Sequence, residues 1–332
     1  KKKKGKKKKK GGKKKKPKKI KLPGGKLIYD MDDYTILKEL IFNQICKYLP
    51  SASITDFLGE YNYIHSMLDD IKETLYDPSL ALIRQLVTEY IIFPLGSELV
   101  RNRVLESIKS FLFYGPAGTG KTLIVRACAT ETNSLLFDIS PANIDGKYAD
   151  VKKAEEKLIA SVMVTAKEYQ PSIIYIDEME KVMPAKKKGK KGKKGGKKKK
   201  NDPSNPTRIK KVLAKWTKKF MSHETRITII GCTSMPEEGS KKEFKKFFDK
   251  TIYFPFPDYT TRRLMWKNFI EKHNGRLKSD FPLSTLAHIS AGYSAGSIQR
   301  TCKKVLTDYR IKYQEQRPLV LQEFIGPLSL CE

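Results

Sequence analysis

Cysteine and histidine are scarce in this sequence, which has five cysteines and four histidines among 332 residues. The cysteines are odd in number and widely spaced, without a C-x-x-C pair, which argues against a disulfide framework or a zinc site. The histidines are isolated along the chain, so we expect each of them to be structural. This pattern is typical of a protein from a reducing compartment.

Long hydrophobic runs are also missing. No uninterrupted apolar segment approaches the ~20 residues that a transmembrane helix needs. The basic start lacks the apolar stretch of a secretory signal. The sequence therefore predicts no membrane partner, and an intracellular protein that is either soluble or attached to a large assembly.

Acidic residues are absent from two lysine-rich tracts. Residues 1–19 hold 15 lysines and residues 186–200 hold 11, so the tracts carry 26 of the formal net charge of +31 and leave +5 for the rest. Such runs bury too little apolar surface to offset the entropy of ordering them, and we expect both to be disordered. They are interpreted either as electrostatic contacts with an acidic partner (nucleic acid, an anionic membrane or glutamate-rich tubulin tails) or as solubilising spacers.

Helical patterns precede the first strand. Apolar residues at helical spacing over 33–49 predict a lead-in helix whose buried face includes Ile36 and Ile41. A second helix is predicted over 79–94, ended by its proline.

From residue 110 onward, five short apolar runs alternate with helical segments. Fully apolar strands separated by helices indicate a parallel sheet covered on both faces. Beyond residue 258 the pattern is purely helical and ends in a long helical run over 295–316. The predicted fold is α/β: a five-stranded parallel sheet flanked by helices, with a helical lead-in and a small C-terminal helical domain.

Residues 115–122, "GPAGTGKT", match the phosphate-binding motif G-x-x-x-x-G-K-[ST] and lie between a strand and a helix, as the motif requires. Its glycines let backbone N–H groups surround phosphates, Lys121 reaches the outer phosphates, and the Thr122 hydroxyl holds magnesium. The predicted cofactors are ATP or ADP with Mg²⁺. The predicted nucleotide-binding residues here are Gly115, Pro116, Ala117, Gly118, Thr119, Gly120, Lys121, Thr122 and Leu123.

Asp177 and Glu178 follow the apolar run "SIIYI", at a strand end where an open parallel sheet places its ligand site. Asp177 is predicted to hold the water shell of Mg²⁺ and Glu178 to polarise the attacking water. Acids after an apolar run are a weak signal alone, because acids often begin loops. The phosphate loop upstream makes a metal and general-base site the better interpretation.

Four motifs in order resemble the AAA ATPase family from about residue 70 onward, apart from the lysine-rich insertion. "GPAGTGKT" is similar to the family's "GPPGTGKT", "SIIYIDEME" to "IIFIDEID", "TIYFPFPDYTTR" to the strand before the small domain, and "LAHISAGYSAGSIQRTCKKV" to a segment whose loop faces the nucleotide. The resemblance implies an AAA-type P-loop NTPase fold and adds Gly296 to the nucleotide site. The expected domains are a disordered tail (1–26), a helical lead-in (27–76), the large nucleotide-binding subdomain (77–257, with a disordered insertion at 186–204) and the small helical subdomain with the C-terminal tail (258–332).

Departures from the family pattern concern catalysis. Ser234 stands where the family has the asparagine of its first sensor, and this shorter side chain is a weakened sensor. Phe247 and Lys250 replace the two arginines of the family's "GRFDR", which reach the neighbouring subunit's ATP. An arginine finger contributes ~10³ to 10⁵ in rate, and a lysine lacks its planar fork. Tyr148 keeps the aromatic of the family's pore loop, or is an ordinary surface tyrosine.

The lead-in "IRQLVTEYIIFPLGS" and the lysine-glycine tracts most resemble the IQ-motif-and-AAA-domain group of the nexin-dynein regulatory complex in motile cilia; any IQ motif would lie outside this chain. That resemblance implies a structural and regulatory subunit of the axonemal cytoskeleton, bound to doublet microtubules beside other subunits of the complex. One alternative is an active remodelling ATPase related to microtubule-severing enzymes. A nucleic-acid factor is least favoured, because the rest of the chain carries only +5.

Overall fold

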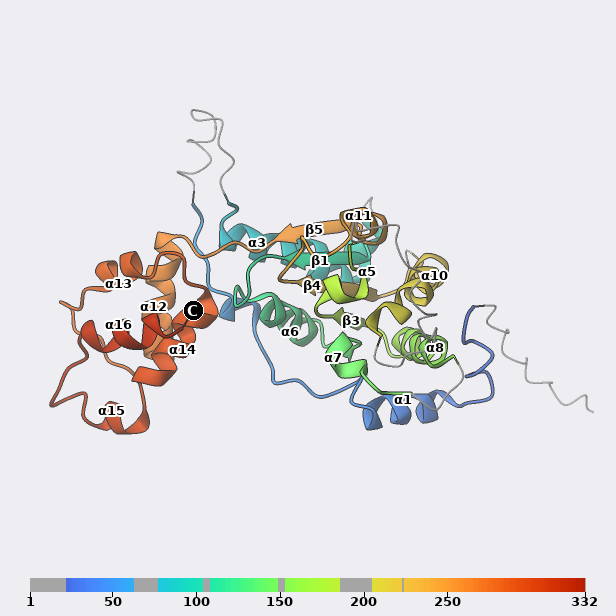
Figure 1. Cartoon of the computed structure of the whole chain (residues 1–332), viewed down its shortest axis with the longest axis horizontal. Coiled ribbons are helices and arrows are strands. Elements are labelled where there is room, and N and C mark those ends of the chain that lie inside the picture. Colours follow the sequence, from blue (N-terminus) through green and yellow to red (C-terminus); the bar gives the residue numbers. More distant parts are fainter. Residues whose placement is uncertain are drawn as a thin grey trace, which may run out of the picture.

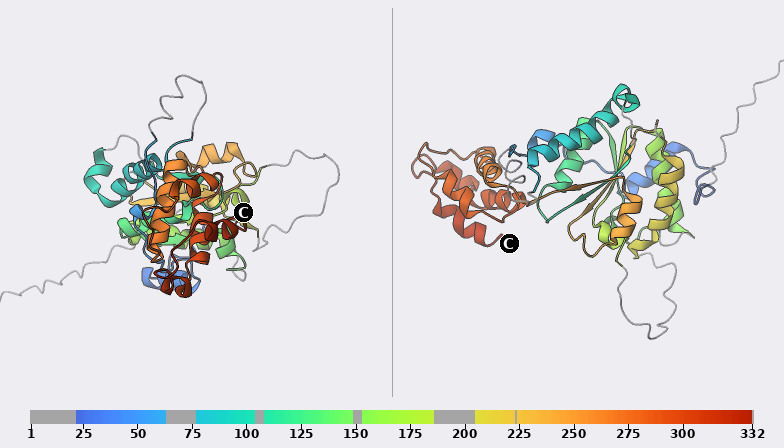
Figure 2. Two further views of the ribbon diagram at one scale, coloured as in Figure 1. Left: turned by 90° about the vertical axis from the view of Figure 1, so that its left-hand side faces the viewer. Right: turned by 90° about the horizontal axis from the view of Figure 1, so that it is seen from above.

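The described residues of the computed structural model are 22–62, 77–103, 108–148, 153–185, 205–222 and 224–331. Both lysine-rich tracts, and the disorder expected for them, lie outside these ranges. Figure 1 shows two parts arranged along the long axis: a sheet with its helices, and a smaller group of C-terminal helices. The right-hand view in Figure 2 shows the same division from above.

A parallel sheet forms the centre of the larger part. Its strands are β1 (Ser110–Tyr114), β2 (Leu135–Asp138), β3 (Ser172–Ile176), β4 (Ile227–Thr233) and β5 (Lys250–Tyr253). Their order is β2-β3-β4-β1-β5, and every neighbouring pair is parallel. The carboxyl ends of β1, β4 and β3 are therefore adjacent at one edge of the sheet. The predicted five-stranded parallel sheet is confirmed.

Helices cover both faces of this sheet. α8 (Ala154–Glu168) and α10 (Lys210–Phe220) pack on the face that includes Leu112, whereas α6 (Lys121–Glu131) packs on the face that includes Phe113. Successive strand residues point to opposite faces, so the strands are apolar at nearly every position. This double burial explains why the strands could be recognised as continuous apolar runs.

The lead-in helix α1 (Asp33–Phe42) lies on α8 and is held there by the Glu39–Lys157 ion pair of 2.6 Å. Its buried face is narrow, and Ile41 is 53% exposed. The prediction that Ile41 shares the buried face was wrong, because only Ile36 and Leu40 of α1 are buried, where they join the core.

The chain leaves α1 early and turns at Gln44, which has a left-handed φ of 54°. The next residues run beside the edge strand β2, where Cys46 forms an antiparallel bridge with Phe137. Lys47 then pairs with Asp138 at 2.8 Å. The predicted helix over 33–49 is therefore too long, because its second half covers a sheet edge that would otherwise be unpaired.

The second helix passes its proline instead of ending there. α3 (Leu80–Val87) continues through a π-helical turn (Thr88–Ile92) into α4 (Phe93–Gly96), which contains Pro94. A proline lacks the N–H group of an α-helix and its ring clashes with a carbonyl one turn back. The wider π turn displaces those carbonyls, so the prediction that Pro94 ends the helix was wrong.

Short helices complete the larger part. They are η1 (Ile54–Asp56), α5 (Glu98–Arg103), α7 (Pro141–Ile144), α9 (Met179–Val182), η3 (Pro206–Arg208) and α11 (Lys241–Phe247). The folded part also reaches into the segment expected to be tail, because Trp216 donates a hydrogen bond to the carbonyl of Pro23 at 2.9 Å. All five cysteines are buried and free.

The C-terminal part is entirely helical. Its helices are α12 (Tyr259–Lys272), α13 (Leu283–Ile289), α14 (Ala295–Val305), α15 (Asp308–Lys312) and α16 (Gln322–Ser329). The helix expected over 295–316 is split, because the Thr307 side chain caps a new helix by accepting the N–H of Arg310. Among the described residues, no helix is long and apolar enough to cross a bilayer.

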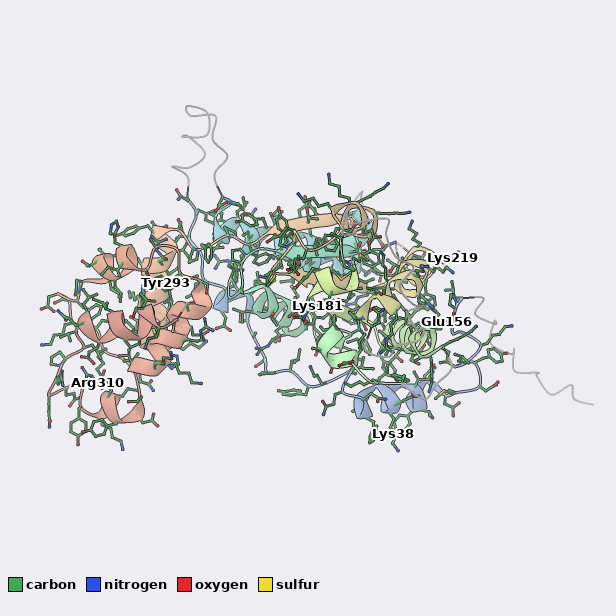
Figure 3. The ribbon with its side chains drawn as sticks, viewed as in Figure 1. Lys38, Glu156, Lys181, Lys219, Tyr293 and Arg310 are labelled. Atoms are coloured by element: carbon green, nitrogen blue, oxygen red, sulfur yellow. The ribbon has the colours of Figure 1, made fainter. Side chains whose placement is uncertain are left out.

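One ion pair closes this helical part. Arg310, labelled in Figure 3, donates from Nε and Nη2 to both carboxylate oxygens of Glu323, at 2.6 and 2.8 Å. The two side chains are only 15% and 19% exposed. Hydrogen bonding to Arg310 lowers the pKa of Glu323. A carboxyl group with a lowered pKa stabilises the fold above its unfolded pKa of about 4.3, and this stabilisation is lost as the pH falls through the lower folded pKa.

We expect Glu323→Gln to lower the free energy of unfolding by about 1–3 kcal/mol at pH 7, because a bidentate charged hydrogen bond is lost. The loss should shrink as the pH falls below about 4, which urea denaturation across pH would measure. Glu315→Gln is the matched control, since its pair with Arg276 has both side chains 74% exposed. Equal losses in the two variants at pH 7 would contradict this assignment.

Candidate functional site

A cavity of about 530 Å³ lies between the carboxyl edge of the sheet and the C-terminal helices. One wall is apolar and comes from the lead-in and α12, including Phe57, Leu58, Met265 and Phe269. The predicted site residues that line the cavity are Ala117, Gly118, Thr119, Gly120, Lys121, Thr122, Leu123, Asp177, Ser234 and Gly296. Residues from the two parts of the chain therefore meet in one pocket.

The phosphate loop requires glycine at three positions. Gly115, Gly118 and Gly120 have φ values of 147°, 78° and 95°, in the region that side chains rarely adopt. Gly120 directly precedes α6, whose first N–H groups have no partner inside the helix. The loop and the helix N-terminus together form a setting suited to an anion such as a phosphate.

Lys121 lies at the base of this loop and is 6% exposed. Its ammonium group donates to the carbonyls of Gly115 at 2.7 Å and Pro116 at 2.6 Å. Burial lowers the pKa of Lys121, while the nearby side chains of Cys232 and Asp177 act in the opposite direction. The positive charge is thus placed directly beneath the loop.

Thr122 and Asp177 line the cavity from two elements and provide oxygen ligands, which Mg²⁺ prefers. Asp177 is oriented by its neighbours: its N–H donates to Ser140 Oγ at 2.8 Å, and its Oδ1 accepts the N–H of Glu178 at 2.9 Å. These residues fit a nucleotide-bound Mg²⁺ in chemical type and in position.

Tyr175 is a site residue that the sequence analysis missed. Its hydroxyl lies 3.3 Å from Thr122 Oγ1. Burial, followed by the charges of Cys232 and Asp177, raises the pKa of Tyr175, so this hydroxyl stays protonated. The signal was visible in the sequence, because "IIYIDE" has a tyrosine where the family's "IIFIDE" has a phenylalanine.

Glu178 does not line the cavity. Its backbone is left-handed, with a φ of 47°, and its carboxylate pairs with Lys181 at 2.6 Å; Lys181 is labelled in Figure 3. Such a backbone is strained for a non-glycine residue. The buried carboxylate nearby belongs instead to Glu180, which accepts the Thr233 hydroxyl at 2.5 Å.

The two residues at the arginine positions are engaged within this chain. The Lys250 ammonium lies 3.4 Å from the ring centroid of Tyr90. Phe247 packs edge-on against Phe248, with ring centroids 4.8 Å apart, and its carbonyl accepts the Ser110 hydroxyl at 3.1 Å.

Tyr148 lies apart from the cavity, packed partly against the core beside α1 and α8. The Lys157 ammonium lies 5.5 Å from its ring centroid. Burial and the neighbouring Glu39 raise the pKa of Tyr148. The side chain is therefore half-buried between helices, and not extended from a loop into solvent.

The C-terminal part touches the phosphate loop directly. The N–H of Gly296 donates to the carbonyl of Gly118 at 2.9 Å. A Cβ atom added to Gly118 would lie 2.5 Å from Ser294 Oγ, and one added to Gly296 would lie 3.3 Å from Gly118. Two glycines thus permit a backbone-to-backbone approach that closes one side of the cavity.

Known proteins resemble this chain in sequence. The family model "ATPase family associated with various cellular activities (AAA)" matches residues 111–256. Mouse Dynein regulatory complex protein 11 is 33% identical over 301 residues, which cover 89% of this chain and 33% of that protein. Spastin of Ixodes scapularis is 29% identical over 257 residues, 74% of this chain and 37% of that protein.

A solved structure supports the fold. The crystal structure of the FIGL-1 AAA domain in complex with ADP has a TM-score of 0.63 and 19% identity, and the match covers 91% of this chain and 92% of that one. This chain spans only about a third of the length of the two curated relatives above. The motif-bearing sheet, the family match and the related sequences agree: the chain belongs to the AAA ATPase family.

Proposed function

We propose that this chain binds ATP or ADP with Mg²⁺ and serves mainly as a structural and regulatory subunit of the axonemal nexin-dynein regulatory complex, with weak or no ATP hydrolysis. It would act on doublet microtubules beside other subunits of the complex and contribute to the control of ciliary and flagellar motility. The observation that carries the proposal is that the predicted binding residues, except Gly115 and Pro116, line one cavity, whereas Glu178 lies outside its lining.

Nucleotide binding is supported by the loop, the lysine and the oxygen ligands. The backbone N–H groups of the loop and α6 would receive the phosphates, and Lys121 would add a charge from below. Thr122 and Asp177 would hold Mg²⁺, which neutralises phosphate charge when it is bound. The apolar wall around Phe57 and Met265 offers a dry surface to the base.

Weak hydrolysis is supported by the residues that the reaction would need. Glu178 is paired with Lys181, and Ser234 is shorter than the asparagine expected of a first sensor. Phe247 cannot supply a guanidinium group, and Lys250 is packed over Tyr90. A homo-oligomer of this chain would therefore lack the charge that stabilises the transition state in trans.

A structural role for the nucleotide is supported by the contact between the two parts. Because Gly118 and Gly296 meet beside the cavity, a ligand there would rest on both parts of the chain. A ligand present at 100 times its dissociation constant stabilises the folded state by about 2.7 kcal/mol. The relation to mouse Dynein regulatory complex protein 11 supports membership of that complex.

The alternative is an active ATPase that remodels microtubules or protein complexes, and the spastin relatives favour it. A partner subunit would have to supply the arginine, and Glu178 would have to leave Lys181. The half-buried position of Tyr148 argues against its contacting an extended peptide as a pore-loop residue.

Gly118→Ala should weaken nucleotide binding by more than about tenfold, because a Cβ atom there meets Ser294 and the left-handed backbone adds strain. Binding of a fluorescent ATP analogue, followed by anisotropy, measures the effect. Gly292→Ala is the control, since its φ is +85° but nothing lies within 4 Å of the added Cβ. Similar affinities for the two variants would show that the glycine contact does not shape the site.

The purified chain should hydrolyse ATP far more slowly than about 1 s⁻¹, and Glu178→Gln should change that rate by less than about twofold. Steady-state phosphate release measures both. Lys121→Ala removes the charge beneath the loop, so the phosphate release that it abolishes is the part that comes from this site. A rate near that of ordinary enzymes that collapses in Glu178→Gln would establish the remodelling alternative instead.

Mg²⁺ should tighten nucleotide binding about two- to tenfold more in Tyr175→Phe than in the wild type. The reason is that the substitution removes a hydrogen bond that competes with the metal for Thr122 Oγ1. The readout is the ratio of dissociation constants without and with Mg²⁺, from calorimetry. Tyr114→Phe is a matched control at the end of β1, where the ring packs on Tyr253. An unchanged ratio would mean that the tyrosine hydroxyl does not compete with the metal.

A further inference from the structure

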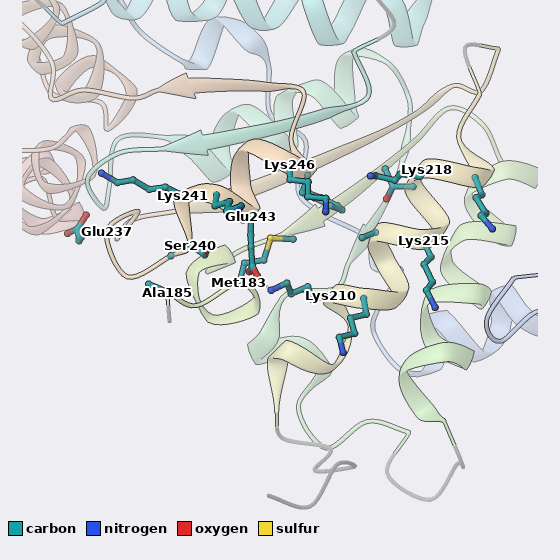
Figure 4. Close-up of a pocket in the computed structure, with 17 residues that line it drawn as sticks. Met183, Ala185, Lys210, Lys215, Lys218, Glu237, Ser240, Lys241, Glu243 and Lys246 are labelled. Atoms are coloured by element: carbon teal, nitrogen blue, oxygen red, sulfur yellow. Dashed lines mark hydrogen bonds and ion pairs between the residues drawn. The ribbon is translucent and has the colours of Figure 1, made fainter. Parts of the chain in front are cut away.

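A second cavity, of about 900 Å³, lies between α10 and α11 and shares no lining residue with the nucleotide cavity. We call it the lysine groove. Figure 4 shows Lys210, Lys215 and Lys218 on α10, with Lys241 and Lys246 on the facing helix. The lysines that line the groove are Lys210, Lys211, Lys215, Lys218, Lys219, Lys241, Lys242 and Lys246.

The walls of the lysine groove are held by buried contacts. α10 turns Val212, Leu213 and Trp216 into the core, which leaves its lysines outward. α11 is fixed by buried Phe244. The segment beneath is tied down as well, because the N–H of Ser240 donates to the carbonyl of Met183 at 2.8 Å. The groove is therefore part of the fold and needs no rearrangement to exist.

Most of the positive charge in the groove is uncompensated. Two glutamates, Glu237 and Glu243, also line it, and Glu243 pairs with Lys210. Within the described ranges, the other seven lysines have no carboxylate within ion-pair distance. Like charges that converge on a concave surface focus their field and attract an anionic ligand.

The lining between the lysines is apolar and contains Met183, Ala185, Ala214 and Phe247. Apolar side chains offer nothing to the phosphates of a nucleic acid, but they can pack against side chains of a peptide. The lining has no arginine, the residue that suits bidentate phosphate recognition, and its single aromatic ring is packed on Phe248 instead of being open to a base.

We propose that the lysine groove binds an acidic polypeptide segment in which glutamate or aspartate residues alternate with apolar ones. The carboxylates pair with the lysines of the two helices, and the apolar side chains pack on Ala185 and Ala214. α10 is 11 residues long, about 16 Å, so it spans about five residues of an extended peptide. This site is independent of the nucleotide proposal.

The test uses the full chain and a fluorescein-labelled peptide of alternating glutamate and leucine. Anisotropy titrations compare the wild type with a triple charge reversal in the groove, Lys215→Glu, Lys218→Glu and Lys246→Glu. All three lysines are exposed. We expect binding to weaken by more than about tenfold, because each reversal turns attraction into repulsion.

A second triple reversal controls for general attraction to the lysine-rich tracts. It changes the net charge equally but uses exposed lysines of the C-terminal part, Lys278→Glu, Lys303→Glu and Lys312→Glu. We expect it to weaken binding by less than about twofold. Equal weakening of peptide binding by the two variants would overturn the proposal. It would also be overturned if the groove reversal weakened binding of a DNA duplex but left peptide binding unchanged.

Hydrogen exchange of the wild-type chain tests the proposal without relying on any substituted variant to fold. Peptide binding should slow exchange in 210–219 and 241–247, which form the two walls. Slowed exchange only elsewhere in the chain would refute the assignment.

Discussion

The backbone contact between Gly118 and Gly296 is the constraint that shapes the cavity in which we propose that nucleotide binds. It joins the phosphate loop to the first turn of α14 by one N–H to carbonyl hydrogen bond of 2.9 Å. It acts together with a buried apolar cluster in which Met265 and Ile298 pack with Phe254, so that α12 and α14 close the apolar side of a pocket whose charged side comes from the sheet. Since any side chain at Gly118 would collide with Ser294, the fold permits this closure only with glycine there.

Nucleotide binding and ATP hydrolysis place different demands on this site, and the energies of the contacts bear on the weak hydrolysis that we propose. The exposed Glu178–Lys181 pair contributes only about 0–1 kcal/mol, but bringing the Glu178 carboxylate to the cavity would also require its left-handed backbone to change. Freeing Lys250 from Tyr90 costs about 0.5–2 kcal/mol. The lost arginine, in contrast, removes a factor of ~10³ to 10⁵, or about 4–7 kcal/mol. In the function that we propose, the largest obstacle to catalysis would therefore be the absent guanidinium group, which no local rearrangement replaces.

Local patterns predicted the sheet and the loop, because strand burial and phosphate binding each leave a short sequence signal. Long-range packing set the rest. Pro94 lies inside a helix because a π turn accommodates it, and Ile41 is exposed because α1 buries only the face with Ile36 and Leu40. The pairing of Glu178 with Lys181 depends on a left-handed residue that no periodicity reveals. The lysine groove could not be predicted from the sequence for a similar reason. The small net charge of +5 outside the lysine-rich tracts does not reveal which lysines lie close together in the folded chain.

Two short segments, residues 177–183 and 234–237, connect the cavity at the phosphate loop with the lysine groove. Asp177 lines the cavity, Met183 lines the groove, and α9 is the single helix between them. α9 is fixed to the sheet by the buried hydrogen bond from Thr233 to Glu180. Because buried hydrogen-bonded acids tolerate little displacement, this link holds the groove in a constant position relative to the sheet. The two sites can therefore be separated by surface substitutions on α10 and α11, which leave α9 and its buried contact unchanged.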